Sequence, residues 1–136
     1  MSVRRDHGFI AVEWVAAVAM LLLPAVVLIG TLPTWAERRH AATIAAREAA
    51  RDLQLHWPAG DAAEAELVAK FVAANRGIDA SEVSVRVLDG GANPGDQIRV
   101  EVRVRMPAIA VPGLAPVGGW TYVAVATLRV DDYRSR

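Results

Sequence analysis

A single carboxylate stands inside the most apolar stretch of this 136-residue chain. Glu13 is the only charged residue in the run from Phe9 to Pro33, which opens with "FIAVEWVAAVAM". An acid at the centre of a bilayer costs roughly 2.5 to 3.5 kcal/mol on insertion scales, and less near the interface. Glu13 lies near the start of the run. Its carboxylate is therefore expected either to reach the headgroup layer or to pair with a cation.

The run is long enough to cross a membrane. Phe9–Leu32, taken as a helix, would be about 36 Å long, and a hydrocarbon core is about 30 Å thick. A cleaved signal peptide has a shorter apolar core, although Ala17–Ala19 has the spacing of a cleavage site. A plain single-pass anchor and an anchor that begins with a processing site both fit better. Pro24 is expected to bend the helix, and Pro33 marks the exit from the apolar run.

Charge and cysteine content exclude several classes of function. The 15 basic and 15 acidic residues balance, so no global field favours nucleic acid. The chain has no cysteine, which excludes disulfides and thiol chemistry. Arg4 and Arg5 precede the apolar run, and Arg38 and Arg39 follow it. Because the positive-inside rule counts these residues, charge alone does not orient the segment.

The stretch "GFIAVEW" resembles the processing site of type IV prepilins and pseudopilins. In that class a membrane-embedded aspartic peptidase cuts after the glycine of a short basic leader, and glutamate is the fifth mature residue. The resemblance implies a leader from Met1 to Gly8, a cut between Gly8 and Phe9, and Glu13 as that glutamate. Trp14 stands where the tight-adherence subclass usually has tyrosine. Gly8 and Phe9 would form the processing site, and Glu13 and Trp14 an assembly contact.

This resemblance gives Glu13 a chemical role. Cleavage would create a free α-amine on Phe9, in or near a medium of low dielectric constant. When such helices pack with a stagger, the Glu13 carboxylate of one subunit can meet the amine of another. The attraction is strong there, and either charge left unpaired is costly, so one register is favoured. Glu13 would then contribute to assembly.

The residues after the apolar run predict a second helical part of the chain. Trp35–Leu55 is rich in Ala, Arg and Glu, all strong helix formers. We interpret residues 35–57 as a stalk helix that continues the membrane helix of residues 9–34. Its small-residue face is either part of a solvated stalk or a close-packing face for partner helices. That face contains Ala42, Ile44, Ala45, Ala49 and Leu53.

Residues 58–136 are expected to form a small α+β domain outside the membrane. "HWPAGD" breaks the stalk, and Asp61 is expected to cap a second helix that runs to about Asn75 and ends at Gly77. The apolar side of this helix is expected to contain Leu67, Val68, Phe71 and Val72.

Period-two alternation predicts three strands, near 82–88, 97–106 and 120–130. We expect a three-stranded antiparallel sheet whose apolar face is covered by the second helix. The segment Pro107–Gly119 is apolar and carries no charge. It is expected to fold back on the sheet, and an exposed hydrophobic contact surface is the alternative.

No pattern of residues predicts catalysis, a cofactor or a metal site. The zinc-peptidase, nucleophile-elbow and phosphate-loop motifs do not occur in the sequence. His7 falls in the expected leader, and His40 and His56 are far apart in the sequence. Asp131 and Asp132 are adjacent and would point in different directions on a strand. We therefore expect a protein that is not an enzyme.

The second predicted strand carries a row of basic residues on one face. Arg99, Arg103 and Arg105 would share one face of the middle strand, where they could meet nucleic-acid phosphates. Glu101 interrupts this row, and no aromatic residues alternate with it. A solvated sheet face is therefore the favoured interpretation, and no nucleic-acid partner is expected.

The whole layout resembles the minor pseudopilins of the tight-adherence pilus system, the TadE-like family. The ending, "VRVRMPAIAVPGL" followed by "YVAVATLRVDDY", also resembles that family. The resemblance implies a bacterial cytoplasmic membrane protein with its domain outside, which helps to build or tip a pilus. Expected partners are the prepilin peptidase, pilin and other minor pseudopilins, the assembly platform and the lipid bilayer. The alternative is a membrane-tethered binding module that is not processed.

Overall fold

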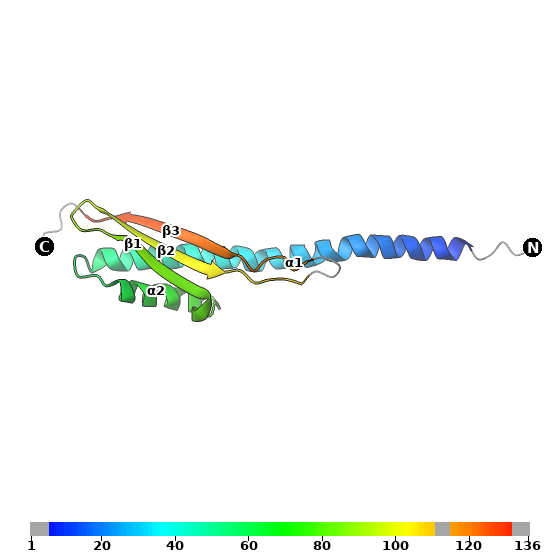
Figure 1. Cartoon of the computed structure of the whole chain (residues 1–136), viewed down its shortest axis with the longest axis horizontal. Coiled ribbons are helices and arrows are strands. Elements are labelled where there is room, and N and C mark those ends of the chain that lie inside the picture. The colour runs from blue at the N-terminus through cyan, green and yellow to red at the C-terminus, as the bar shows by residue number, and fades with distance from the viewer. Residues whose placement is uncertain (1–5, 111–114, 132–136) are drawn as a thin grey trace, which may run out of the picture.

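The computed structural model describes residues 6–110 and 115–131, with side chains from Ala11 onward. It contains a long N-terminal helix, a second helix and a three-stranded antiparallel sheet (Figure 1). This confirms the α+β architecture expected from the sequence.

Helix α1, Asp6–Leu55, runs through 50 residues without interruption. It continues through both Pro24 and Pro33, so the apolar run and the helix after it form one element. All described side chains from Ala11 to Leu23 are exposed. Figure 1 shows this half projecting from the rest of the molecule.

The C-terminal half of α1 belongs to the core of the domain. The interpretation of residues 35–57 as a stalk is therefore not confirmed. Small side chains line the buried face, and they pack within this chain rather than remaining free for partner helices. Ile44, which the sequence predicts on that face, is only half-buried. The buried residues are Ala41, Ala42, Ala45, Ala46, Ala49, Ala50, Leu53 and Trp57.

Helix α2, Ala62–Ala74, has the termini expected from the sequence. The Asp61 carboxylate accepts a hydrogen bond from the Ala63 N–H at 3.0 Å, which satisfies one of the free donors of the first turn. Gly77 has a φ of +73°, a conformation that favours glycine after a helix.

The expected apolar side of α2 is wrong. Ala65, Ala69 and Ala73 are fully buried, whereas Leu67 and Phe71 are 69 % and 67 % exposed. Val68 and Val72 are half-buried. The reason is the partner surface, because α1 presents alanines to α2 and two alanine faces allow the backbones to approach closely. Larger side chains on the contact face would hold the two helices apart.

The sheet is a meander in which β2 is the central strand. A short 3-10 turn, η1 (Ala80–Glu82), leads into β1 (Val83–Gly90), followed by β2 (Gln97–Arg105) and β3 (Thr121–Arg129). The predicted alternation of β2 is confirmed. Its inward residues, Ile98, Val100, Val102 and Val104, are all 0 % exposed.

Two helices cover the apolar face of this sheet, rather than the second helix alone. α1 packs against β2 and β3, and α2 packs against β1 (Figure 1). The alanines of α1, the alanines of α2 and the valines of the sheet form one continuous core.

The loop between β2 and β3 does not fold back on the sheet. Its described arms, 107–110 and 115–120, leave the sheet and run along α1 (Figure 1). Ile109 and Val117 pair across the two arms through N–H to O contacts of 2.7 and 2.9 Å. Val111 and Leu114, two of the apolar residues noted in this loop, lie outside the described residues.

The alanine contact between α1 and α2 predicts that larger side chains on the contact face destabilise the fold. Ala69→Leu should destabilise the fold by about 1–3 kcal/mol, because added volume forces closely packed helices apart. Ala74→Leu, at an exposed position of the same helix, should change stability by less than about 0.5 kcal/mol. Thermal unfolding of the full chain in detergent micelles measures both. Equal stability of the two variants would contradict close packing at Ala69.

Candidate functional site at the apolar helix and its junction with the domain

The N-terminal half of α1 has the size and composition of a membrane-spanning segment. An 18-residue window of this helix has a mean hydropathy of 2.6, and none of it is buried within the molecule. Many of its large side chains are exposed. Val12, Val15, Met20 and Leu21 are 69 to 77 % exposed. The helix is therefore long and apolar enough to cross a bilayer.

The four residues singled out in the sequence all lie near the start of this helix. Gly8 and Phe9 belong to the first turns of α1, and the Phe9 side chain lies outside the described part of the structure. Glu13 is exposed and has no ion-pair partner among the described residues. Trp14 is 70 % exposed. A partner for either side chain must therefore come from outside the described part of this chain.

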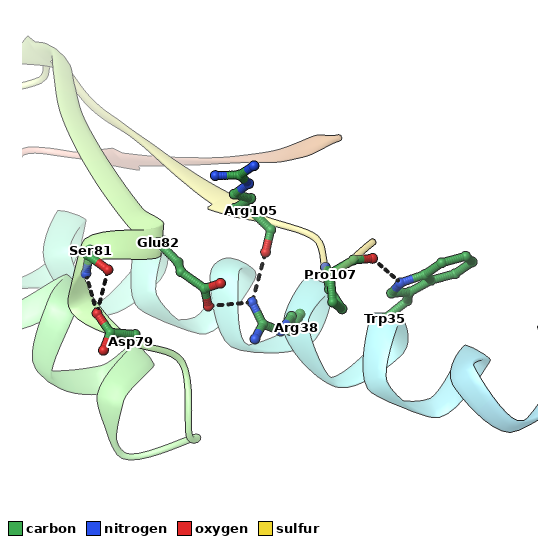
Figure 2. A network of polar contacts seen from close by, with 7 residues as sticks. All are labelled: Trp35, Arg38, Asp79, Ser81, Glu82, Arg105 and Pro107. Atoms are coloured by element: carbon green, nitrogen blue, oxygen red, sulfur yellow. Dashed lines mark hydrogen bonds and ion pairs between the residues drawn. The ribbon is translucent and has the colours of Figure 1, made fainter. Parts of the chain in front are cut away.

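A polar network ties α1 to the sheet just beyond the apolar run. One guanidinium nitrogen of Arg38, Nη1, donates to Glu82 Oε2 at 2.7 Å and to the Arg105 carbonyl at 2.8 Å (Figure 2). The side chains of Arg38 and Glu82 are 18 % and 32 % exposed. Arg38 thereby links η1, the turn before β1, and the end of β2 to one turn of α1.

Two tryptophans lie one turn closer to the apolar run. Trp35 Nε1 donates to the Pro107 carbonyl at 3.3 Å, as Figure 2 shows. Its ring lies 4.8 Å from that of Trp120, centroid to centroid, at an interplanar angle of 59°. Both ends of the loop between β2 and β3 are thus held against the same side chain of α1.

A groove of about 370 Å³ opens beside these rings. The Arg39 guanidinium lies over the Tyr122 ring at 5.2 Å, a cation–π arrangement at the groove's edge. Aromatic rings combined with a cation suit a ligand or surface with both apolar and anionic parts. The groove is lined by Leu32, Trp35, Ala36, Arg39, Met106, Trp120 and Tyr122.

The turn before β1 is fixed by Asp79. Its carboxylate accepts from the Ser81 hydroxyl at 2.6 Å and from the Ser81 N–H at 2.8 Å (Figure 2). These hydrogen bonds lower the pKa of the fully exposed Asp79 carboxyl, and the bond from the Ser81 hydroxyl has the larger effect. A lowered pKa stabilises the fold above the unfolded-state pKa, and the contribution is lost as the pH falls through the folded-state pKa.

A possible metal-ligating group lies at the opposite end of α1. Asp52, His56 and Glu64 have ligand atoms within 4.8 Å of one another. His56 Nδ1 is 3.2 Å from Asp52 Oδ1 and 3.0 Å from the Asp52 carbonyl oxygen, so contacts within the protein already account for this pair. The sequence analysis noted His56 but missed this group. The i, i+4 spacing of Asp52 and His56 was a usable signal, whereas the approach of Glu64 depends on the turn between the helices.

The outer face of the sheet carries the arginine row expected from the sequence. Arg99, Arg103 and Arg105 are exposed there. Glu101 binds Arg103 at 2.7 Å, so it neutralises one member of the row. Arg86 on β1, opposite Glu101, adds a cation that the sequence analysis did not include.

Sequence analysis also missed the junction itself. Arg38 entered only as a charge beside the apolar run, and Trp35 only as the first residue of a helix. The signal available was positional, since aromatic and basic residues often flank a membrane segment. Their contacts with Glu82, Arg105 and Pro107 depend on the tertiary fold.

The Arg38 network predicts a coupled loss of stability. Arg38→Ala should cost about 1–2 kcal/mol, because Glu82 and the Arg105 carbonyl lose a charged donor while solvent screens part of the effect. Arg47→Ala, an exposed arginine on the same helix, should cost less than about 0.5 kcal/mol. Thermal unfolding in micelles with a double-mutant cycle against Glu82→Ala measures the coupling. A coupling energy of zero would contradict the network.

No protein-family model, curated protein or solved structure matches the chain. The bare apolar helix and the polar junction at its end are therefore the features from which a function can be inferred.

Proposed function

We propose that the chain is a minor pseudopilin-like structural protein of a tight-adherence or type IV-like pilus. The observation that carries this proposal is the division of α1 into two halves. One half is bare and apolar, and the other is built into the core of a small domain. An exposed apolar surface of this size requires lipid or neighbouring helices around it. A subunit that passes from a bilayer into a helix bundle meets both requirements.

Glu13 favours a bundle over lipid alone. It is exposed on the apolar half and has no cation near it in the described part of the chain. An isolated carboxylate in a plain anchor costs free energy and contributes nothing. In a bundle, the Phe9 amine of a processed neighbour would supply the missing cation, and Trp14 would pack against the same neighbour.

The domain leaves only the apolar half of α1 available for such packing. The alanine face of the other half is covered by α2 and the sheet. Its exposed positions include charged residues, among them Arg47, Glu48 and Arg51. Close contacts between helices of different subunits would therefore be confined to the part of α1 on the N-terminal side of Trp35. The domain would stay at the surface of the assembly.

Processing would remove the first turn of α1. The bond between Gly8 and Phe9 lies within this helix, close to its start at Asp6. Because the first four N–H groups of a helix lack intrahelical partners, the first turn unwinds at low cost. A peptidase can therefore reach the bond without opening the rest of the helix.

The first prediction from this proposal is cleavage between Gly8 and Phe9. Intact-mass spectrometry of membrane-extracted protein should detect the loss of Met1–Gly8 in cells that contain a prepilin peptidase. Cells without the peptidase should yield the full chain, and so should a Gly8→Val variant. An intact N-terminus in peptidase-containing cells would contradict the processing step.

The second prediction concerns Glu13. Glu13→Leu and Glu13→Gln should be cleaved normally but should lose co-assembly with pilin, because the amine of the neighbouring chain keeps no carboxylate partner. Trp14→Tyr, which retains a large aromatic side chain, is the matched control and should assemble. Detergent-resistant crosslinking to pilin and counts of surface pili measure assembly. Normal piliation by both Glu13 variants at equal protein levels would contradict the role of Glu13.

A membrane-tethered binding module without processing is the second candidate. The exposed arginines of the outer sheet face favour it, since a row of guanidinium groups suits an anionic partner. If the chain is such a module, its N-terminus should be intact and the Glu13→Leu protein should still bind its partner. The same two experiments therefore distinguish this function from the first.

A further inference from the structure

We propose that the free edge of β3 binds an extended, acidic segment of another protein, which adds a fourth strand to the sheet. This interaction surface lies in the domain and goes beyond the proposed function, since it depends neither on processing nor on the placement of α1 in a bilayer. The occupant is defined by its chemistry. It has an extended backbone, carboxylates on the face that meets α1, and β-branched side chains on the other face.

The first argument is the direction of the backbone groups of β3. At one end of the ladder with β2, the Met106 N–H donates to the Trp120 carbonyl at 2.8 Å. At the other end, the Val130 N–H donates to the Asp96 carbonyl at 2.9 Å, in the same register. Hydrogen-bonded pairs alternate with non-bonded pairs in an antiparallel ladder. The even-numbered residues of β3 therefore bond to β2, and the odd-numbered residues direct their N–H and C=O groups to the free edge.

These outward backbone groups form a row along the edge. Val123, Val125 and Thr127 have no backbone partner at this edge among the described residues. At the end of the row, Gln54 Nε2 of α1 donates to the Arg129 carbonyl at 2.6 Å, so a donor beside the edge has room to bind. Unpaired edge groups are a template for another strand, and main-chain hydrogen bonds provide the affinity in this mode of recognition.

β3 lacks the features that commonly block the edge of a sheet, which are charged residues, proline and bulges. It pairs with β2 from end to end without a register shift, and its sequence before Arg129, "TYVAVATL", has no charge and no proline. Figure 1 shows β3 at the margin of the sheet. The other edge strand, β1, has a register shift between Val87 and Asp89, and α2 packs against it. β3 is therefore the edge that accepts another strand.

A groove of about 360 Å³ lies between this edge and α1. Its β3 wall consists of consecutive residues, which point alternately to the two faces of the sheet. The groove therefore follows the edge of the strand rather than either face, and this is the place that an added strand would occupy. The groove is lined by Arg47, Glu48, Arg51, Val125, Ala126, Thr127 and Leu128.

The α1 wall of the groove selects the charge of the occupant. Arg47 and Arg51 are exposed and form no ion pair with the described residues. Glu48 is the only carboxylate in the lining, so the wall is positive on balance. Guanidinium groups bind carboxylates through paired hydrogen bonds. The inward side chains of an added strand would meet this wall, and carboxylates fit there.

The outer face of the edge suits β-branched side chains. Val123 and Val125 are 43 % and 49 % exposed there, and cross-strand pairs of β-branched residues stabilise a sheet. A second copy of this chain fits less well. Pairing β3 with β3 would bring the arginines of two α1 helices towards one another across the junction, and like charges repel. An acidic segment of a different protein avoids this repulsion.

Peptide binding to the full chain in zwitterionic detergent micelles tests the proposal. The probe is a fluorescein-labelled peptide, Glu-Val-Glu-Thr-Glu-Val-Glu, and the same peptide with lysine in place of glutamate is the charge control. Fluorescence anisotropy should detect binding of the acidic peptide alone, and added salt should weaken it. The double variant Arg47→Glu, Arg51→Glu should weaken binding at least about tenfold. Arg76→Glu, an exposed position beyond α2, is the matched control and should leave binding unchanged.

Amide exchange measured by NMR locates the peptide on the strand. The acidic peptide should slow exchange of the N–H groups of Val123, Val125 and Thr127 about tenfold or more. Ala124 and Ala126, which already bond to β2, should change less. Val125→Pro should abolish binding because it removes an N–H that points to the free edge, whereas Val125→Thr should retain it.

Equal binding of the two peptides, or binding of neither, would overturn the proposal. Binding without slower exchange at the three edge amides would also overturn it, and would place the peptide on the outer arginine face instead. Edge amides that become protected without peptide, as the protein concentration rises, would assign the edge to a second copy and reject the acidic occupant. If Val125→Pro does not fold, amide exchange in the unaltered chain still decides between these outcomes.

Discussion

The structure depends on one helix that must satisfy two environments. The N-terminal half of α1 exposes apolar side chains over most of its described surface, which is stable only in lipid or against other helices. The C-terminal half exposes charges on one side and buries alanines on the other. Because the backbone is a continuous helix from Asp6 to Leu55, the two halves share one axis. The position of one half therefore fixes the position of the other.

Small side chains make this arrangement possible. A helix that carried leucines beneath the sheet would stand further from β2 and β3, and α2 would be displaced with it. The alanines of α1 instead allow the sheet and α2 to approach the same helix from two sides. Large residues are then needed only where the contacts end, at Leu53 and Trp57. Trp57 also donates to the Gly91 carbonyl at 2.7 Å, which closes the far end of the core.

The sequence predicted the elements of this fold better than their packing. Strand β2 could be placed because its valines alternate with charged residues, and alternation depends only on one strand having a wet face. The buried side of α2 could not be predicted in this way, because Leu67 and Phe71 are more hydrophobic than alanine and dominate any hydrophobic pattern. Which face is buried was decided by the alanines of α1, a fact of tertiary structure. The stalk was not confirmed, for the same reason.

The residues of the candidate site also fall into two groups, those that local sequence predicts and those whose contacts depend on the fold. Gly8, Phe9 and Glu13 could be proposed from local spacing, since a leader, a cut and a carboxylate are close in sequence. The link from Arg38 to Glu82 and Arg105 joins residues far apart in sequence, and no local pattern could indicate it. Chemistry that depends on a short segment is visible in one sequence, and chemistry that depends on the fold is not.

The continuity of α1 also links Glu13 to the junction with the domain. Glu13 and Arg38 are 25 residues apart in one helix, about 37 Å along its axis. In the proposed bundle, a neighbour whose amine pairs with Glu13 would set the height of this chain, and with it the height of the domain. Staggered subunits would then hold their domains at different heights. Entry into a fibre would therefore exchange the lipid around the apolar half of α1 for protein, and retention in the membrane would hold this subunit at the base of an assembly.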